Sequence, residues 1–270
     1  MADEFFDFQV NPVHVFSLLL YRGNEELLKE LRALEVKPGI AEILGGNRDY
    51  ALYFPSARNR KELFSFASDF FSSALATLQV LLRTPLFEKF YEETLEQKER
   101  VRAQWLANEE RALGILSDLG INIPERRPVV AISIVHESCQ TGYYNSNNQT
   151  ICWGHREDGE DGFSNYWTIY LCHELLHHLI VHPKEKFRWR EADIIHSVIE
   201  LLADNELKRR LNDEQTPPYH GIGHRGVESE IRATIFPLWE SYLSKEERDI
   251  RAFIEEVTPW VLSKHPEIWE

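Results

Sequence analysis

Two histidines four residues apart give the clearest chemical signal in the sequence. The segment LCHELLHHLIVH (171–182) contains His173 and His177, and Glu174 follows the first of them. On a helix, residues i and i+4 share one face, so both imidazoles can reach one metal ion at about 2 Å. Glu174 lies about 100° around the helix and projects beside the ion, where a carboxylate can take a proton from a metal-bound water. The H-E-x-x-H pattern therefore predicts a zinc hydrolase.

A catalytic zinc generally has three protein ligands and an open position, so a third ligand is needed. One known extension of the motif places a histidine six residues after the second, but that position holds Pro183. The other option is a carboxylate from a second helix, and Glu200 and Asp204 lie four residues apart in VIELLAD (198–204). Acids among apolar neighbours are costly to bury unless a positive charge meets them, although a solvated acidic face is the alternative. We therefore expect Glu200 to bind the metal and Asp204 to accept a hydrogen bond from a ligand imidazole.

Other potential ligands lie near these residues. His196 precedes Glu200 by one helical turn on a similar face and is the reserve ligand. His178 and His182 lie off the face of the motif pair, so we expect structural or surface roles for them. Cys172 is expected to be a small core residue, although a ligand role is conceivable.

Hydrophobic periodicity predicts the helices. Apolar residues recur at three and four in 25–36 and 57–120, with a possible break at Thr84-Pro85. The active-site helix is expected over 166–181, with Ser164 or Asn165 as its N-cap. Further helices are expected over 191–212 and, as a pair, over 227–264.

Strands and turns are predicted between these helical regions. VVAISIV (129–135) and QTICWG (149–154) have the composition of strands, and TGYYNSNNQT (141–150) that of a turn. The resulting fold class is α+β, mostly helical with a small mixed sheet. A soft boundary in the loop 118–128 divides the chain into a helical N-terminal region of unassigned role, 1–125, and a catalytic domain, 126–270.

The amino-acid composition of the chain limits which kinds of partner it can bind. The 270 residues carry a formal net charge of −14, which argues against nucleic-acid binding because that function needs a basic surface. The start MADEFFDFQV lacks the features of a signal peptide, and the apolar run VFSLLLY (15–21) is too short to span a membrane. Three cysteines, an odd number without ligand-pair spacing, suit reduced thiols. We therefore expect a cytoplasmic protein with neither nucleic acid nor membrane as a partner.

At HELLH (173–177) and ELLAD (200–204) the sequence resembles the gluzincins, the thermolysin-like branch of the zincin metallopeptidases. The resemblance covers about 150–225 and implies a zincin-like catalytic domain. It implies zinc binding by His173, His177 and Glu200, catalysis by Glu174 as general base, and support of a zinc-bound histidine by Asp204.

The resemblance also implies an edge strand before the active-site helix that holds extended peptides by strand addition, and QTICWG is in the corresponding place. A downstream Tyr or His usually stabilises the oxyanion in this family. Tyr219, His220 and His224 in the loop 216–226 are the candidates, and His224 is favoured.

The sequence therefore predicts a zinc metallopeptidase with one Zn²⁺ per chain and a peptide or protein substrate; it does not specify the cleavage site or the oligomeric state. Cobalt or manganese would also suit the ligands in vitro. The alternative is a zincin-like domain that binds zinc and mediates interactions without peptidase activity. A helical protein without a metal is the third possibility, and zinc content separates it from the other two.

Overall fold

The computed structural model describes nine stretches of the chain: 5–21, 25–27, 29, 84–124, 130–145, 149–156, 164–180, 189–213 and 227–264. Several predictions concern other residues. The expected helix over 57–83, most of that over 25–36, and the loop 216–226 with Tyr219, His220 and His224 lie outside the described residues, as does His182.

The fold is α+β and mostly helical, with one mixed four-stranded sheet, as predicted. The chain divides into two compact units that interleave along the sequence. One contains Phe6–Arg102 and Ala131–Arg156 and holds nearly all of the sheet; the other contains Met1–Phe5, Ala103–Val130 and Glu157–Glu270 and is helical. These units differ from the predicted division into 1–125 and 126–270, which rested on a change of composition alone. No helix in the described part of the chain is long and apolar enough to cross a membrane.

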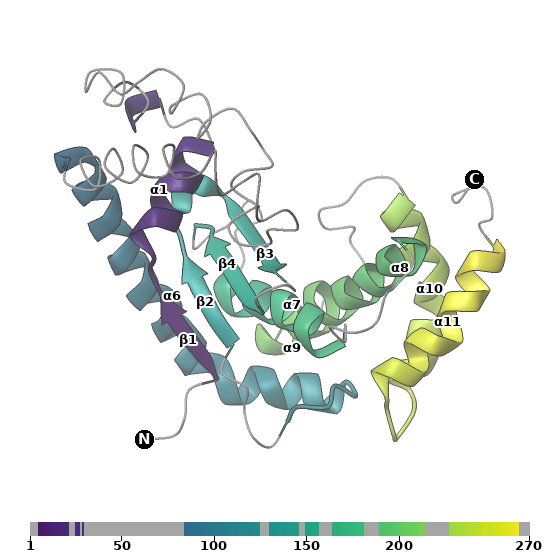
Figure 1. The fold of residues 1–270 in the computed structure, drawn as a ribbon. Helices are drawn as coiled ribbons and strands as arrows, with labels where there is room; N and C mark the ends of the chain where they lie inside the picture. The colour runs from purple at the N-terminus through teal and green to yellow at the C-terminus, as the bar shows by residue number, and fades with distance from the viewer. Residues whose placement is uncertain are drawn as a thin grey trace. The chain divides into compact units, whose positions relative to one another are not determined.

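The sheet has the strand order β1-β2-β4-β3 (Figure 1). Its strands are β1 (Phe6–Gln9), β2 (Val130–Ile134), β3 (Thr141–Asn145) and β4 (Thr150–Gly154). β2 runs parallel to β4, and β3 runs antiparallel to β4. The predictions of β2 and β4 are confirmed, whereas β1 was not predicted.

Two predictions about the sheet are wrong. The segment 141–145 is a strand and not part of a turn, because its Thr and two Tyr favour the pleated surface and pair in register with β4, Tyr143 opposite Cys152. QTICWG is not the edge strand, because β4 lies between β2 and β3 and hydrogen-bonds to both. The edges are β1 and β3. Four of the five residues of β4 are buried, whereas every residue of β3 is half-buried.

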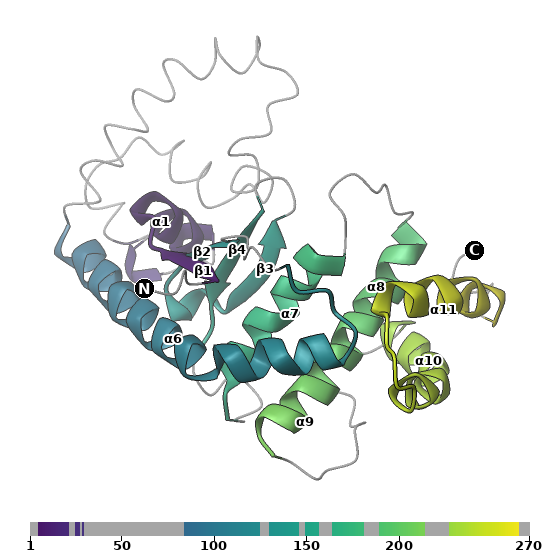
Figure 2. The ribbon, with the colours of Figure 1, turned by 90° about the horizontal axis from the view of Figure 1, so that it is seen from below.

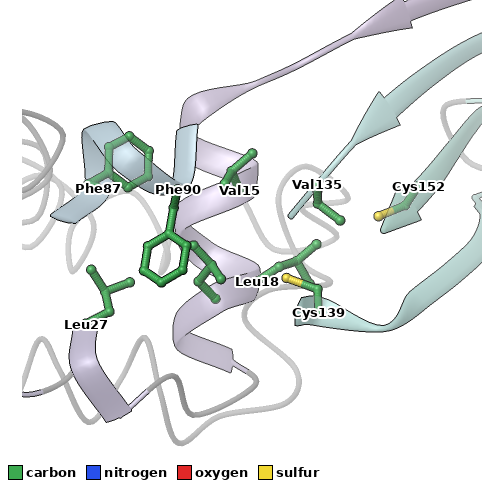
Figure 3. Packing of buried hydrophobic residues seen from close by; sticks show 9 residues of the cluster. Val15, Leu18, Leu27, Phe87, Phe90, Val135, Cys139 and Cys152 are labelled. Atoms are coloured by element: carbon green, nitrogen blue, oxygen red, sulfur yellow. The ribbon is translucent and has the colours of Figure 1, made fainter. Parts of the chain in front are cut away.

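The core of the sheet unit forms where two helices meet the strands. α1 (Pro12–Tyr21) and the first turns of α6 (Pro85–Asp118) bury apolar side chains against Val135 and Cys152 (Figure 3). The 3₁₀ helix η1 (Glu137–Cys139) adds Cys139 to the same cluster. All three cysteines are free and buried, in agreement with the expected reduced thiols.

α6 begins at the predicted break. Pro85 is its first residue, where a missing backbone N–H removes no helical hydrogen bond. Thr84 caps this end, because its Oγ1 accepts a hydrogen bond from the Phe87 N–H at 3.3 Å. The helix then runs for 34 residues without interruption.

The helical unit contains the second half of α6 and the helices after the sheet (Figures 1 and 2). These are α7 (Tyr166–Ile180), α8 (Trp189–Glu200), the π-helix η2 (Leu201–Leu207), α9 (Lys208–Leu211), α10 (Val227–Leu243) and α11 (Ile250–Lys264). α8 packs against α7, α10 and α11. The expected helix over 191–212 is therefore present but contains a π-helical segment that was not predicted.

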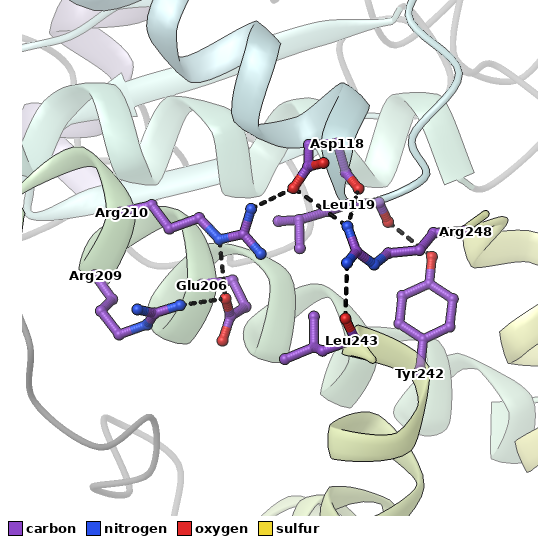
Figure 4. A network of polar contacts seen from close by, with 8 residues as sticks. All are labelled: Asp118, Leu119, Glu206, Arg209, Arg210, Tyr242, Leu243 and Arg248. Carbon is purple, nitrogen blue, oxygen red and sulfur yellow. Dashed lines mark hydrogen bonds and ion pairs between the residues drawn. The ribbon is translucent and has the colours of Figure 1, made fainter. Parts of the chain in front are cut away.

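A polar network joins α6 to α9 and to the turn after α10 (Figure 4). Asp118 at the end of α6 accepts hydrogen bonds from Arg210, at 2.5 Å, and from Arg248, through its backbone carbonyl at 2.9 Å. Arg210 also donates to the buried Glu206 at 3.1 Å, and Tyr242 donates to the carbonyl of Leu119 at 2.7 Å. These contacts tie the end of α6 to α9, to the end of α10 and to the turn that follows it.

Candidate metal centre

α7, which carries the H-E-x-x-H motif, is fixed at its N-terminus by α6. The side chain of Gln104 accepts a hydrogen bond from the Thr168 N–H at 3.1 Å and satisfies one of the free donors of the first turn. Asn165, one of the two residues predicted to cap this helix, occupies the N-cap position, because its carbonyl accepts the first helical hydrogen bond from the Ile169 N–H at 3.0 Å, but its side chain bonds elsewhere. Asn165 has a left-handed backbone, φ 59°, and its side chain instead donates to Asn212 at 2.8 Å and accepts from Asn108 at 3.1 Å.

The buried face of α7 includes the first histidine and the acid of the motif. His173 is 7% exposed and Glu174 is 5% exposed. Cys172 is fully buried, and burial raises the pKa of its thiol, so the core role predicted for it is confirmed. Glu174 is therefore not a solvated surface acid.

Three imidazoles converge between α7 and α8. The ring of His196 lies 5.4 Å from that of His173 and 5.3 Å from that of His177, centroid to centroid, and the rings of His173 and His177 are 5.3 Å apart. One ring nitrogen from each lies within 4.8 Å of the others. Among the described residues these three form a group that can hold a metal ion, and we call it the histidine cluster.

The spacing of the histidine cluster fits a metal ion. Two nitrogens bound to one zinc at 2.0–2.1 Å lie at most about 4 Å apart, so side-chain movements of less than about 1 Å would bring all three onto one ion. His173 is buried, whereas His177 and His196 are half-buried and partly exposed to solvent. Burial, and then the neighbouring His196, lower the pKa of His177 to about 4. His177 is therefore neutral at pH 7, which is the form that binds metals.

Two further side chains lie beside the ring of His173. Tyr170, one turn earlier on α7, stacks on its ring at 5.6 Å with an angle of 27° between the planes. The Oδ2 of Asp204 lies 4.0 Å from its Nδ1. The sequence predicted that Asp204 accepts a hydrogen bond from a ligand imidazole. The carboxylate lies beside the ring of His173, but 4.0 Å is longer than a hydrogen bond, so its influence on the imidazole is mainly electrostatic.

The π-helix η2 explains how Asp204 reaches this position. In an α-helix, four residues rotate the chain by about 40° more than a full turn. The side chain of Glu200 therefore points about 40° away from that of His196 around the axis of α8. A π-helical residue turns the chain through a smaller angle, so the next four residues bring Asp204 back toward the face of His196. π-helical segments often occur at functional sites because they change which side chains face a neighbour.

Glu200, the predicted third ligand, occupies a different environment. Its carboxylate pairs with Arg232 of α10, and the two side chains are 2% and 4% exposed. It is not part of the histidine cluster, in which His196, the reserve ligand, stands beside His173 and His177. The burial predicted for Glu200 is confirmed, and the positive charge that meets it is an arginine.

Sequence reasoning missed two contributors to this site. Arg232 gives a weak signal in hindsight, as a cation between the apolar residues of EIRATIF (230–236), where it needs a buried acid. Tyr170 gives none beyond its position one turn before His173. His178, also on α7, is half-buried and lies outside the histidine cluster, as expected, and burial lowers its pKa.

Neither a protein family, nor a curated protein, nor a solved structure matches this chain.

Proposed function

We propose that the chain is a zinc-dependent peptidase whose metal is held by His173, His177 and His196. The observation that carries this proposal is the convergence of three imidazoles beside the glutamate of an H-E-x-x-H helix. Three neutral nitrogen ligands on two helices suit zinc, and they leave a fourth position for water and substrate. His177 and His196 are partly exposed, so the histidine cluster is not sealed from solvent.

The proposed ligand set differs from the gluzincin pattern in its third member. The order of motif, glutamate and aspartate along the chain supports a relationship to the zincins, and the Asp204 carboxylate lies 4.0 Å from Nδ1 of His173. His196, one turn before Glu200, takes the place of the glutamate. The substitution retains the number of protein ligands that a catalytic zinc needs.

A bound zinc ion would polarise the scissile carbonyl and make a coordinated water acidic near neutral pH. Glu174 then accepts the proton of the attacking water and delivers it to the leaving amine. Tyr170 stacks on the ring of His173 and the Asp204 carboxylate lies 4.0 Å from its Nδ1, and these two neighbours would orient the imidazole for metal binding. Each role is assigned to a residue whose side chain is buried or half-buried.

Zinc content and hydrolysis together test the proposal. Protein purified without chelator should contain about one zinc per chain, before or after zinc is added back. Glu174→Gln should keep the zinc and lose cleavage of unfolded proteins and short peptides, because an amide cannot accept the proton. Glu240→Gln, an exposed position on α10, is the matched control and should retain both.

The outcomes separate the alternatives. Zinc without hydrolysis in the unmodified protein would favour a zinc-binding interaction module. A Glu174→Gln variant as fast as the unmodified protein would remove Glu174 from the mechanism, and absence of zinc under both conditions would refute the metal centre.

A further inference from the structure

Three side chains spaced by four residues project from α8 and η2, and the outer two meet the histidines of α7. His196 packs against both motif histidines, and Asp204 lies 4.0 Å from His173. The middle residue, Glu200, instead pairs with Arg232, which comes from α10. This ion pair links α10 to the row of side chains.

The Glu200–Arg232 pair is almost completely buried, so separating its two charges is energetically costly. Taking either charge out of water costs several kcal/mol unless an opposite charge and hydrogen bonds replace the water. A guanidinium also has a planar array of donors that matches a carboxylate. Moving the Glu200 carboxylate to another partner would therefore take the opposite charge of this ion pair away from a buried guanidinium.

We propose that Arg232 is a positioning residue that decides which side chain of α8 completes the metal centre. By holding Glu200 in the ion pair, it leaves His196 as the third ligand. This inference rests on the metal centre of the proposed function. Glu200 is one turn from His196 on the same helix, and a carboxylate is a good zinc ligand. The chain therefore contains a second, latent ligand set of two histidines and one glutamate, which Arg232 keeps out of use.

The choice of ligand sets the charge of the centre. Three neutral imidazoles leave the full charge of the ion available to polarise a carbonyl, whereas a glutamate ligand would cancel part of it. In a variant that lacks the positive charge of Arg232, the buried carboxylate of Glu200 would need another cation, and a bound zinc ion could supply that charge. Loss of Arg232 should therefore make Glu200 a ligand as well as break an ion pair.

Zinc affinity, measured by competition with a chelator, tests this proposal in a set of variants. His196→Ala should weaken binding by more than about 100-fold, beyond the 10–100-fold loss typical of a residue that only supports a ligand. Glu200→Gln should change it by less than about threefold, because an amide still accepts a hydrogen bond from Arg232. The double variant His196→Ala with Arg232→Met should recover at least about tenfold of the lost affinity, and adding Glu200→Gln should abolish that recovery. The conservative change Arg232→Lys, which keeps the charge, should give no recovery in the His196→Ala background.

A second measurement applies if Arg232→Met is poorly folded. Zinc should raise the midpoint of thermal unfolding more in Arg232→Met than in the unmodified protein, because only there does it also neutralise Glu200. The excess rise should disappear when Glu200→Gln is added. A purely structural Arg232 predicts equal rises in all three proteins, which would overturn the proposal.

The remaining outcomes distinguish this inference from the proposed function. Zinc binding that survives His196→Ala and is lost in Glu200→Gln would make Glu200 the native ligand and overturn the inference while keeping the zinc centre. A folded double variant without recovered affinity would also overturn it. An unmodified protein that binds no zinc would refute the proposed function itself.

Discussion

Replacing Asp204 by Asn should weaken zinc binding by about tenfold. Carboxylates that orient a ligand imidazole typically contribute 10–100-fold to metal affinity. The 4.0 Å between Asp204 Oδ2 and His173 Nδ1 is longer than a hydrogen bond, so its effect is mainly electrostatic and falls at the lower end of that range. Tenfold corresponds to about 1.4 kcal/mol of binding free energy. The amide keeps the shape of the side chain and removes its charge, so the loss reports on the charge.

The assay is a zinc titration in competition with a chelator, at an ionic strength where surface charges are screened. Asp213→Asn is the matched control, because Asp213 is an exposed carboxylate at the end of α9 and its left-handed backbone, φ 54°, also suits asparagine. Its zinc affinity should be unchanged. Equal affinities for the Asp204→Asn variant and the unmodified protein, or an equal loss in the control, would refute the assignment of Asp204.

Three further predictions concern the helices that position the site, and each is measured by urea unfolding. Gly120→Ala should destabilise the fold by at least about 2 kcal/mol, since φ is +84° and an added Cβ would lie 2.5 Å from the Tyr242 hydroxyl and 2.7 Å from the backbone at Arg248. Gly114→Ala, its control on the exposed side of α6, should stabilise it by about 0.5–1 kcal/mol, because nothing lies within 4 Å of the new methyl group; a loss there would contradict the reasoning. Gln104→Ala should cost about 1 kcal/mol through the lost cap of α7, and no change would show that the cap is dispensable. A hydrogen bond from Arg210 holds the pKa of Asp118 below its ordinary value. The contribution of Asp118 to the free energy of unfolding, below about 1 kcal/mol for this exposed group, is therefore present above about pH 4 and is lost as the pH falls through the folded pKa. The stability difference between Asp118→Asn and the unmodified protein should therefore shrink at low pH, and a constant difference would exclude this linkage.

The sequence was sufficient for features that depend on spacing within one element. The period of α7 identified the helix and its paired histidines, and the Thr84-Pro85 step marked the start of α6. Burial of Glu200 followed from its apolar neighbours, because a periodic pattern reports which face of a helix is covered.

Features that depend on a partner from elsewhere in the chain could not be read in this way. Strand β3 has the Gly and Asn content of a turn, and pairing with β4 decides its structure. The cap of α7 is supplied by Gln104, which is 64 residues away in sequence, and no local capping signal indicates it. The π-helix η2 has no sequence signature comparable to a proline or a glycine, yet it determines where Asp204 points.

The choice between His196 and Glu200 shows the physical limit most clearly. His196 and Glu200 lie four residues apart on α8, and the side chain of each can bind zinc. The periodicity of the helix therefore does not favour one of them over the other as a ligand. A buried carboxylate needs a positive partner, and a metal ion and an arginine satisfy that need equally well. Arg232 is 32 residues further along the chain, and only its placement beside Glu200 identifies which cation meets the acid. The burial argument therefore predicts correctly that a cation is present. The identity of that cation, and with it the third ligand that we propose, depends on how α10 packs against α8.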